Sequence, residues 1–166
     1  ALAKGNQYYA QAKYAEAEAH LTRAVELDPR SPMAFSDRSR ARFQQGKYRE
    51  AAIEYLNAIK IDQRYAEAHY GLAKVYVQQG YAAGAYQQLI AVSNLQPENM
   101  SAQIDIGDIF LKAKEFQRAR ERAEAVLARD PNTVNAHILL ANSYAGISNF
   151  DESIRAMQTA IQLAPE

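Results

Sequence analysis

A spacing of 34 residues recurs along this chain of 166 residues and constrains its fold more than any other feature. Four prolines follow it, lying 34 or 68 residues apart: Pro29, Pro97, Pro131 and Pro165. One column of small residues keeps the same spacing: Gly5, Ser39, Ala73, Gly107 and Ala141. A largely aromatic column does so too: Tyr8, Arg42, Tyr76, Phe110 and Tyr144. This period predicts an array of small units whose neighbours bury each other's apolar faces.

Each unit has the pattern of two helices. In the second unit, Ser31 followed by Pro32 predicts an N-cap and a first helical residue. We expect this helix to extend to about Gln45, where the next residue, Gly46, can adopt the left-handed conformation that ends helices. The second helix should run from about Tyr48 to about residue 61, because its apolar residues recur every three or four positions.

The repeat resembles the tetratricopeptide repeat, with a small residue followed three positions later by an aromatic one, an alanine before a bulky residue, and a closing proline. The resemblance implies an all-α fold, a right-handed α-solenoid superhelix of five helix-turn-helix units. It also implies that the first helix of each unit lines a concave face and the second mainly forms the convex side. We expect a single array with repeats at about 1–31, 32–65, 66–99, 100–133 and 134–166.

Short side chains allow helix axes to approach closely. We therefore expect Gly5 or Ala17, and their equivalents in other units, to receive an aromatic side chain from a neighbouring helix.

Composition excludes several classes of protein. The 19 basic and 19 acidic residues cancel, so the overall charge gives no general attraction for nucleic acid or membranes. Without cysteine the chain has no disulfide, no cysteine-based zinc site and no thiol nucleophile. Its apolar stretches are shorter than the roughly 18 residues that indicate a membrane span. We expect a soluble protein without direct membrane insertion, and the sequence leaves the cytoplasm and the periplasm open.

No residue pattern indicates catalysis. The chain lacks a glycine-rich phosphate loop, a paired-histidine zinc motif and a nucleophile elbow. His69 and His137 share one column and are predicted to pack, whereas His20 is predicted to lie on the surface. Asp105 and Asp108 share a helix face, but two carboxylates without a third ligand make a poor metal site. We therefore predict no catalytic residues, no metal, no cofactor and no enzymatic activity.

Charge is uneven between the units. The second unit carries seven basic and four acidic residues, a net charge of +3, and the fifth carries one basic and three acidic, a net charge of −2. Nucleic-acid binding needs a continuous basic stripe with stacking aromatics, which only the second unit approaches. We therefore expect no nucleic-acid partner.

Polar side chains with scattered apolar ones are expected on the concave face. Such a surface on rigid helices suits an extended or helical peptide. We predict a non-catalytic protein-protein interaction scaffold that binds a peptide or helical segment of a protein partner there. The candidate binding residues are Asn6, Asp37, Arg40, Gln44, Tyr70, Lys74, Gln78, Asp105, Asp108 and Asn142.

Two specialised members of the family use this face differently. Cochaperones hold a partner's terminal carboxylate with Lys, Asn, Asn, Lys and Arg, and the matching positions here are Leu2, Asn6, Asp37, Glu67 and Gly71. Only Asn6 agrees, and the two acidic residues would repel a carboxylate. An asparagine ladder, used by glycosyltransferase-associated arrays, is reduced here to Asn6 and Asn142. Neither role is favoured.

Two alternatives stay open. Beside the peptide-binding scaffold, one is an assembly module cut from a larger enzyme or from a bacterial envelope or secretion complex, and the other is a self-association element. The second alternative rests on Ile154, Met157 and Ile161, which no following helix covers. It makes a homo-oligomer through the C-terminal repeat possible.

Overall fold

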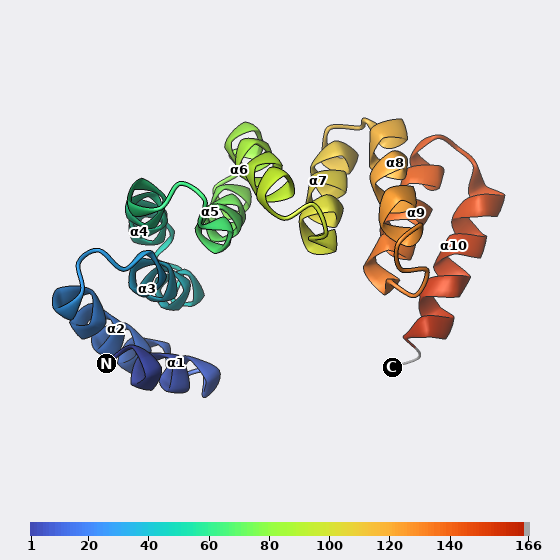
Figure 1. Cartoon of the computed structure of the whole chain (residues 1–166). Helices are drawn as coiled ribbons and strands as arrows, with labels where there is room; N and C mark the ends of the chain where they lie inside the picture. Colours follow the sequence, from blue (N-terminus) through green and yellow to red (C-terminus); the bar gives the residue numbers. More distant parts are fainter. Residues whose placement is uncertain (165–166) are drawn as a thin grey trace. The chain divides into compact units, whose positions relative to one another are not determined.

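The computed structural model describes residues 1–164, so the prediction that Pro165 closes the last unit lies outside the described residues. Over this range the chain forms ten α-helices and no strand (Figure 1). The helices pack in consecutive pairs, α1 on α2 and so on to α9 on α10. Their bounds are α1 Leu2–Ala10, α2 Tyr14–Leu27, α3 Pro32–Gln44, α4 Tyr48–Ile61, α5 Ala66–Gln78, α6 Ala82–Leu95, α7 Met100–Lys112, α8 Phe116–Leu127, α9 Val134–Gly146 and α10 Phe150–Leu163.

The second pair shows how the sequence sets these bounds. The Ser31 hydroxyl accepts a hydrogen bond from the Ala34 amide at 3.2 Å, and Pro32 is the first residue of α3. The helix ends one residue before the predicted Gln45, and Gly46 adopts the left-handed conformation with φ of 74°. The predicted cap, turn and second helix are thereby confirmed.

In each of the five pairs of the described chain, one residue between the two helices adopts the left-handed conformation. Beyond it, the chain returns an amide to the last turn, as in the 3.0 Å bond from Lys47 N to Arg42 O. Two of these residues are glycine and three are not: Ala12 (φ 57°), Gly46 (74°), Gly80 (73°), Lys114 (60°) and Ser148 (61°).

A residue with φ near −135° ends each second helix except α8, where Ala128 stays in the right-handed helical region, and proline does not create this conformation. Asp28, which precedes a proline, has φ of −137°, and Asp62, which precedes Gln63, has the same value. Both carboxylates accept a hydrogen bond from the amide two residues later, Asp28 from Arg30 at 3.1 Å and Asp62 from Arg64 at 2.9 Å. An aspartate turn of this kind supplies the bend where the proline is missing.

The chain divides into two compact units, Ala1–Gln96 with α1 to α6 and a second from Pro97 onward with α7 to α10. Small and branched side chains form the interior of each. In the first unit one cluster lies between α4 and α5: Ala51, Tyr55, Ala58, Ala68, Leu72 and Val75. In the second unit the buried residues include Ile106, Ala123, Val126 and Leu139.

The expectation of an aromatic side chain at Gly5 was wrong. A Cβ at Gly5 would overlap Leu21 of α2, and one at Gly107 would overlap Leu139 of α9, so leucine fills both spaces. Aromatic rings do pack around Ala17, where Tyr8 and Tyr9 lie against its cluster. No helix in the described part of the chain is long and apolar enough to cross a membrane.

Candidate functional site

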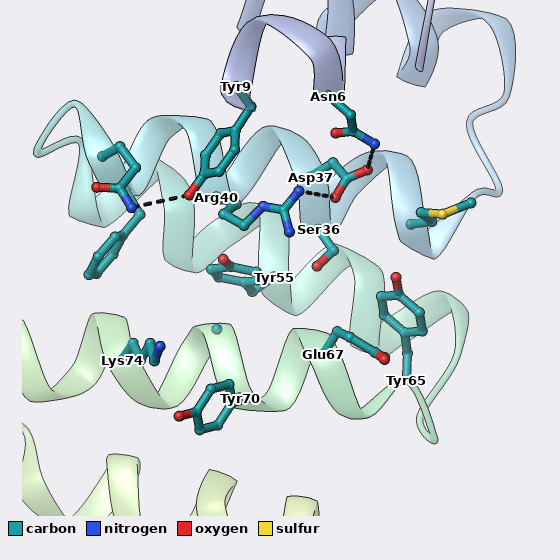
Figure 2. A pocket seen from close by; sticks show the side chains of 14 residues that line it. Asn6, Tyr9, Ser36, Asp37, Arg40, Tyr55, Tyr65, Glu67, Tyr70 and Lys74 are labelled. Carbon is teal, nitrogen blue, oxygen red and sulfur yellow. Dashed lines mark hydrogen bonds and ion pairs between the residues drawn. The ribbon is translucent and has the colours of Figure 1, made fainter. Parts of the chain in front are cut away.

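The first unit contains a pocket of about 480 Å³ that lies among α1, α3 and α5, the first helix of each of its three pairs (Figure 2). Four tyrosines line it, and we therefore call it the tyrosine pocket. Its complete lining is Asn6, Tyr9, Met33, Ser36, Asp37, Arg40, Phe43, Gln44, Tyr55, Tyr65, Glu67, Tyr70, Gly71 and Lys74.

The pocket brings together six of the ten candidate residues: Asn6, Asp37, Arg40, Gln44, Tyr70 and Lys74. Gln78 is exposed on α5, one turn beyond Lys74, and does not line it. The remaining three candidates lie in the second unit, Asp105 and Asp108 on α7 and Asn142 on α9. The candidate residues are therefore divided between the two units.

Hydrogen bonds and ion pairs organise the edge of the pocket formed by α1 and α3. Asp37 is buried, accepts a hydrogen bond from Asn6 Nδ2 at 2.8 Å and pairs with Arg40 Nη2 at 3.1 Å. The Arg40 guanidinium lies 4.5 Å from the centre of the Tyr9 ring. Gln44 donates to the Tyr9 hydroxyl at 3.1 Å. Asp37 and Arg40 therefore offset each other's charge, and these contacts link α1 to α3 at this edge.

The α5 edge carries charges of a different kind. Glu67 lies in the first turn of α5 and is exposed. Lys74 is also exposed, and its ammonium lies 4.6 Å from the centre of the Tyr70 ring. Within residues 1–164 neither Glu67 nor Lys74 forms an ion pair.

Tyr55, which lines the pocket, was not among the residues predicted from the sequence. Tyr55 is only 4% exposed, and it comes from α4, a second helix that was expected on the opposite side. Its ring lies over Gly71, where a Cβ would overlap it. A signal was present, because the equivalent positions in the other repeats are all apolar (Leu21, Leu89, Ala123 and Met157), whereas Tyr55 carries a hydroxyl.

Burial shapes the ionisation of the tyrosines. It raises the pKa of Tyr55, with Arg40 opposing the shift, so that the hydroxyl stays protonated. Burial also raises the pKa of Tyr65, and the carboxylates of Glu67 and Asp37 add to the shift. Both hydroxyls are therefore available as hydrogen-bond donors at neutral pH.

An ionic network joins α2, α3 and α4 outside the pocket. Arg42 lies between two carboxylates, 2.8 Å from Glu18 and 3.1 Å from Glu54. Arg38 pairs with Glu54 at 2.5 Å and Lys47 with Glu18 at 2.7 Å. Three of the basic residues that give the second repeat (32–65) its positive charge are thus paired within the fold.

The network changes the acidity of Glu18. Partial burial acts to raise its pKa, but hydrogen bonds from Lys47, Arg42 and Gln45 outweigh burial and lower the pKa from 4.5 to about 2. The carboxylate is therefore ionised throughout the physiological range.

The histidines have structural partners. His69 Nε2 lies 3.0 Å from the Gln63 carbonyl, and His137 Nε2 lies 2.8 Å from the Pro131 carbonyl, so each ties a helix to the loop before it. The surface placement predicted for His20 was wrong, because it is half-buried and stacks on Tyr8 with ring centres 5.1 Å apart. In the described part of the chain, no three histidine or acidic residues form a group that could hold a metal ion.

The candidate residues of the second unit are Asp105 and Asp108 on α7 and Asn142 on α9. Loss of solvation, together with the neighbouring Asp105, raises the pKa of Asp108, and Lys112 opposes the shift. Asp108 and Asn142 are both exposed, and α7 packs on α9.

Comparison with known families identifies the repeat. Three models of the tetratricopeptide repeat match, one described as "TPR repeat" over residues 40–80 and two described as "Tetratricopeptide repeat" over 2–31 and over 81–131 and 104–166. The chain therefore belongs to the tetratricopeptide repeat family, and its fold is the all-α solenoid of that family. Family and fold together support a protein-interaction scaffold.

Solved structures share this fold. The structure of pilF from Pseudomonas aeruginosa has a TM-score of 0.89 at 22% identity and covers 98% of this chain and 74% of its own. A MamA structure has a TM-score of 0.83 at 18% identity, covering 96% and 87%. YrrB, described as a TPR protein with an unusual peptide-binding site, has a TM-score of 0.79 at 20% identity, covering 99% and 85%. No curated protein sequence gave a significant match.

Proposed function

We propose that the chain is a non-catalytic scaffold that binds a peptide or helical segment of a protein partner in the tyrosine pocket. The observation that carries the proposal is a 480 Å³ pocket lined by four tyrosines and by charged side chains. The peptide-binding site named for YrrB supports the same use of the fold.

The lining suits a peptide for physical reasons. Tyrosine supplies a large contact area with few rotatable bonds, and its hydroxyl can bind main-chain groups of a ligand. The pairing of Arg40 with Asp37 and the stacking of Lys74 on Tyr70 hold polar groups in place before a ligand arrives. Pre-ordered groups lose less conformational entropy on binding, so affinity improves.

The pairing of the basic residues also supports a protein partner over nucleic acid. Arg38, Arg42 and Lys47 lie in the ionic network, and Arg40 pairs with Asp37. A phosphate backbone needs a stripe of unpaired basic groups, and these pairs interrupt such a stripe in the second repeat.

The proposal predicts that reversing two charges of the pocket weakens peptide binding. Peptides selected from a random displayed library on the wild-type chain should bind the variant Arg40→Glu with Lys74→Glu at least about tenfold more weakly, a loss of roughly 1.4 kcal/mol. Fluorescence anisotropy measures the affinity, and circular dichroism checks that the helices remain.

A matched control separates the pocket from net charge. Arg49 and Lys60 are exposed on α4 and do not line the pocket, so Arg49→Glu with Lys60→Glu changes the charge equally. This control should bind as the wild type does. Equal affinity of the pocket variant and the wild type would contradict the proposal, as would failure of the wild type to select any peptide.

A further inference from the structure

The charged groups of the tyrosine pocket fall into two kinds. Asp37 and Arg40 face each other at 3.1 Å, so they present little net charge to a ligand. Glu67 and Lys74 are exposed and form no ion pair within residues 1–164. A ligand therefore meets one unpaired negative group and one unpaired positive group, both on α5.

These two groups are separated along the helix but share its face. Seven positions correspond to about two helical turns, so the residues lie roughly 10 Å apart along the axis. Glu67 is near Tyr65 at the start of α5, and Lys74 lies towards its end (Figure 2). The α5 edge of the pocket is consequently negative at one end and positive at the other.

A polar group also lies between the charges. Tyr55 is more than nine-tenths buried, lines the pocket and lies over Gly71. Figure 2 shows its ring between α3 and α5, and its hydroxyl has no hydrogen-bond partner among the residues drawn. Because the Tyr55 hydroxyl is protonated and can donate a hydrogen bond, the middle of the pocket is suited to a ligand that supplies an acceptor such as a main-chain carbonyl.

We propose, building on the proposed function, that the tyrosine pocket selects a peptide segment carrying one basic and one acidic side chain about 10 Å apart. The Lys or Arg of this segment pairs with Glu67, and its Asp or Glu pairs with Lys74. The main chain between them accepts a hydrogen bond from the Tyr55 hydroxyl. This distance is about seven positions in a helical ligand, or about three in a polyproline II segment.

Charge complementarity also specifies what the pocket rejects. A segment with two acidic groups at this spacing would bring one of them against Glu67, and a doubly basic segment would bring one against Lys74. Like charges in close contact oppose binding, so the order of the two charges in the ligand should matter.

A structural role for the same residues makes a different prediction. An acidic residue in the first turn interacts favourably with the helix dipole, so replacing Glu67 should lower stability slightly whether or not a ligand binds. Glu50 is an exposed acidic residue in the first turn of α4 and does not line the pocket. Glu50→Lys therefore reproduces the change in charge and in helix-dipole interaction without touching the site.

The experiment selects a random peptide library, displayed on phage, on the full chain and on its variants. Wild-type selection should enrich an acid-base pair at one fixed spacing. Selection on Glu67→Lys should lose the basic member and enrich an acidic residue in its place, and wild-type-selected peptides should bind this variant at least about tenfold more weakly. Glu50→Lys should select the wild-type pattern.

The exchange variant, Glu67→Lys with Lys74→Glu, tests the direction of binding. It should bind a synthetic peptide in which the acid and the base are exchanged, and it should bind the original peptide poorly. Peptides that require the pocket but show no paired charges, or that bind Glu67→Lys unchanged, overturn this inference and leave peptide binding standing. Failure of the wild type to select peptides, or selection of peptides insensitive to every pocket variant, overturns both.

Discussion

Arg42 stands in a column that is otherwise aromatic, with Tyr8, Tyr76, Phe110 and Tyr144 in the other repeats. Where those repeats pack a ring, this one places a guanidinium between Glu18 of α2 and Glu54 of α4. The side chains of Arg42 and Glu54 are largely buried, so removing either partner would leave an uncompensated charge in the fold. One residue thus replaces apolar packing with an electrostatic link across three helices.

The network predicts how stability depends on pH. The folded-state pKa of Glu18 is about 2 and its ordinary value is 4.5, so its contribution is complete above pH 4.5 and is lost as the pH falls towards 2. Wild type should therefore be more stable than Glu18→Gln at pH 6, and the difference should narrow by roughly 1–2 kcal/mol at pH 3. Urea unfolding of the wild type and of Glu18→Gln at pH 6 and at pH 3 measures this difference in the free energy of unfolding.

The control for this prediction lies on the same helix. Glu16 is exposed on α2 and takes no part in the network, so Glu16→Gln should follow the wild-type pH dependence. A difference between wild type and Glu18→Gln that stays constant from pH 6 to pH 3 would show that Glu18 does not stabilise the fold as a carboxylate.

Individual residues also show how far sequence reasoning reached into the site. The column positions of Asn6, Arg40 and Lys74 were sufficient to place them on one face, because first helices repeat every 34 residues. Tyr55 was missed because its ring reaches the pocket from a second helix, through the space left by Gly71. Periodicity predicts where backbones lie, whereas a long side chain crossing between helices depends on which of its neighbours is small.

Among the helices, the bounds predicted from the sequence agree best with the structure where residues at the helix end determine them. Ser31, Pro32 and Gly46 each act within a few residues, and they set the bounds of α3 as expected. The α8 helix ends at Leu127, before the position equivalent to the end of α4, although Pro131 follows at the usual place. The proline limits where a helix must stop, and the preceding residues decide how much earlier it stops.

The turns within the helix pairs provide a test at this scale. Ala12, Lys114 and Ser148 adopt the left-handed conformation without being glycine, which is strained for side chains with a Cβ. Each change to glycine should raise the free energy of unfolding by about 0.5–1 kcal/mol. Chemical denaturation of the three single variants measures this.

The reverse substitution supplies the control for the turns. A Cβ at Gly46 or Gly80 meets no atom within 4 Å, so alanine there adds backbone strain without a clash. Gly46→Ala and Gly80→Ala should each lower stability by about 1 kcal/mol. If all five variants were equally stable, the turn conformation would carry no energetic weight.

At the scale of the whole molecule, α10 carries exposed apolar side chains on one face. Phe150 is 62% exposed, Ile154 55% and Ile161 60%. Their spacing of four and seven positions places them on one stripe of the helix. In the other repeat of the second unit, the equivalent helix α8 packs against α9.

Self-association through this stripe makes a concentration-dependent prediction. The weight-average mass from light scattering should rise with protein concentration for the wild type. The variant Ile154→Glu with Ile161→Glu should remain monomeric, because charges on the stripe oppose its burial. A wild type that is monomeric at every concentration removes this candidate.

The link made by Arg42 also limits how the repeats can be exchanged. Units of equal length and matching columns are in principle modular, and an engineer could graft one in place of another. The second repeat resists this, because its arginine is matched to Glu18 in the repeat before it. A different repeat grafted over residues 32–65 would remove Arg42, Lys47 and Glu54 together and leave Glu18 without the two cations that pair with it. Any replacement of this repeat must therefore also change Glu18.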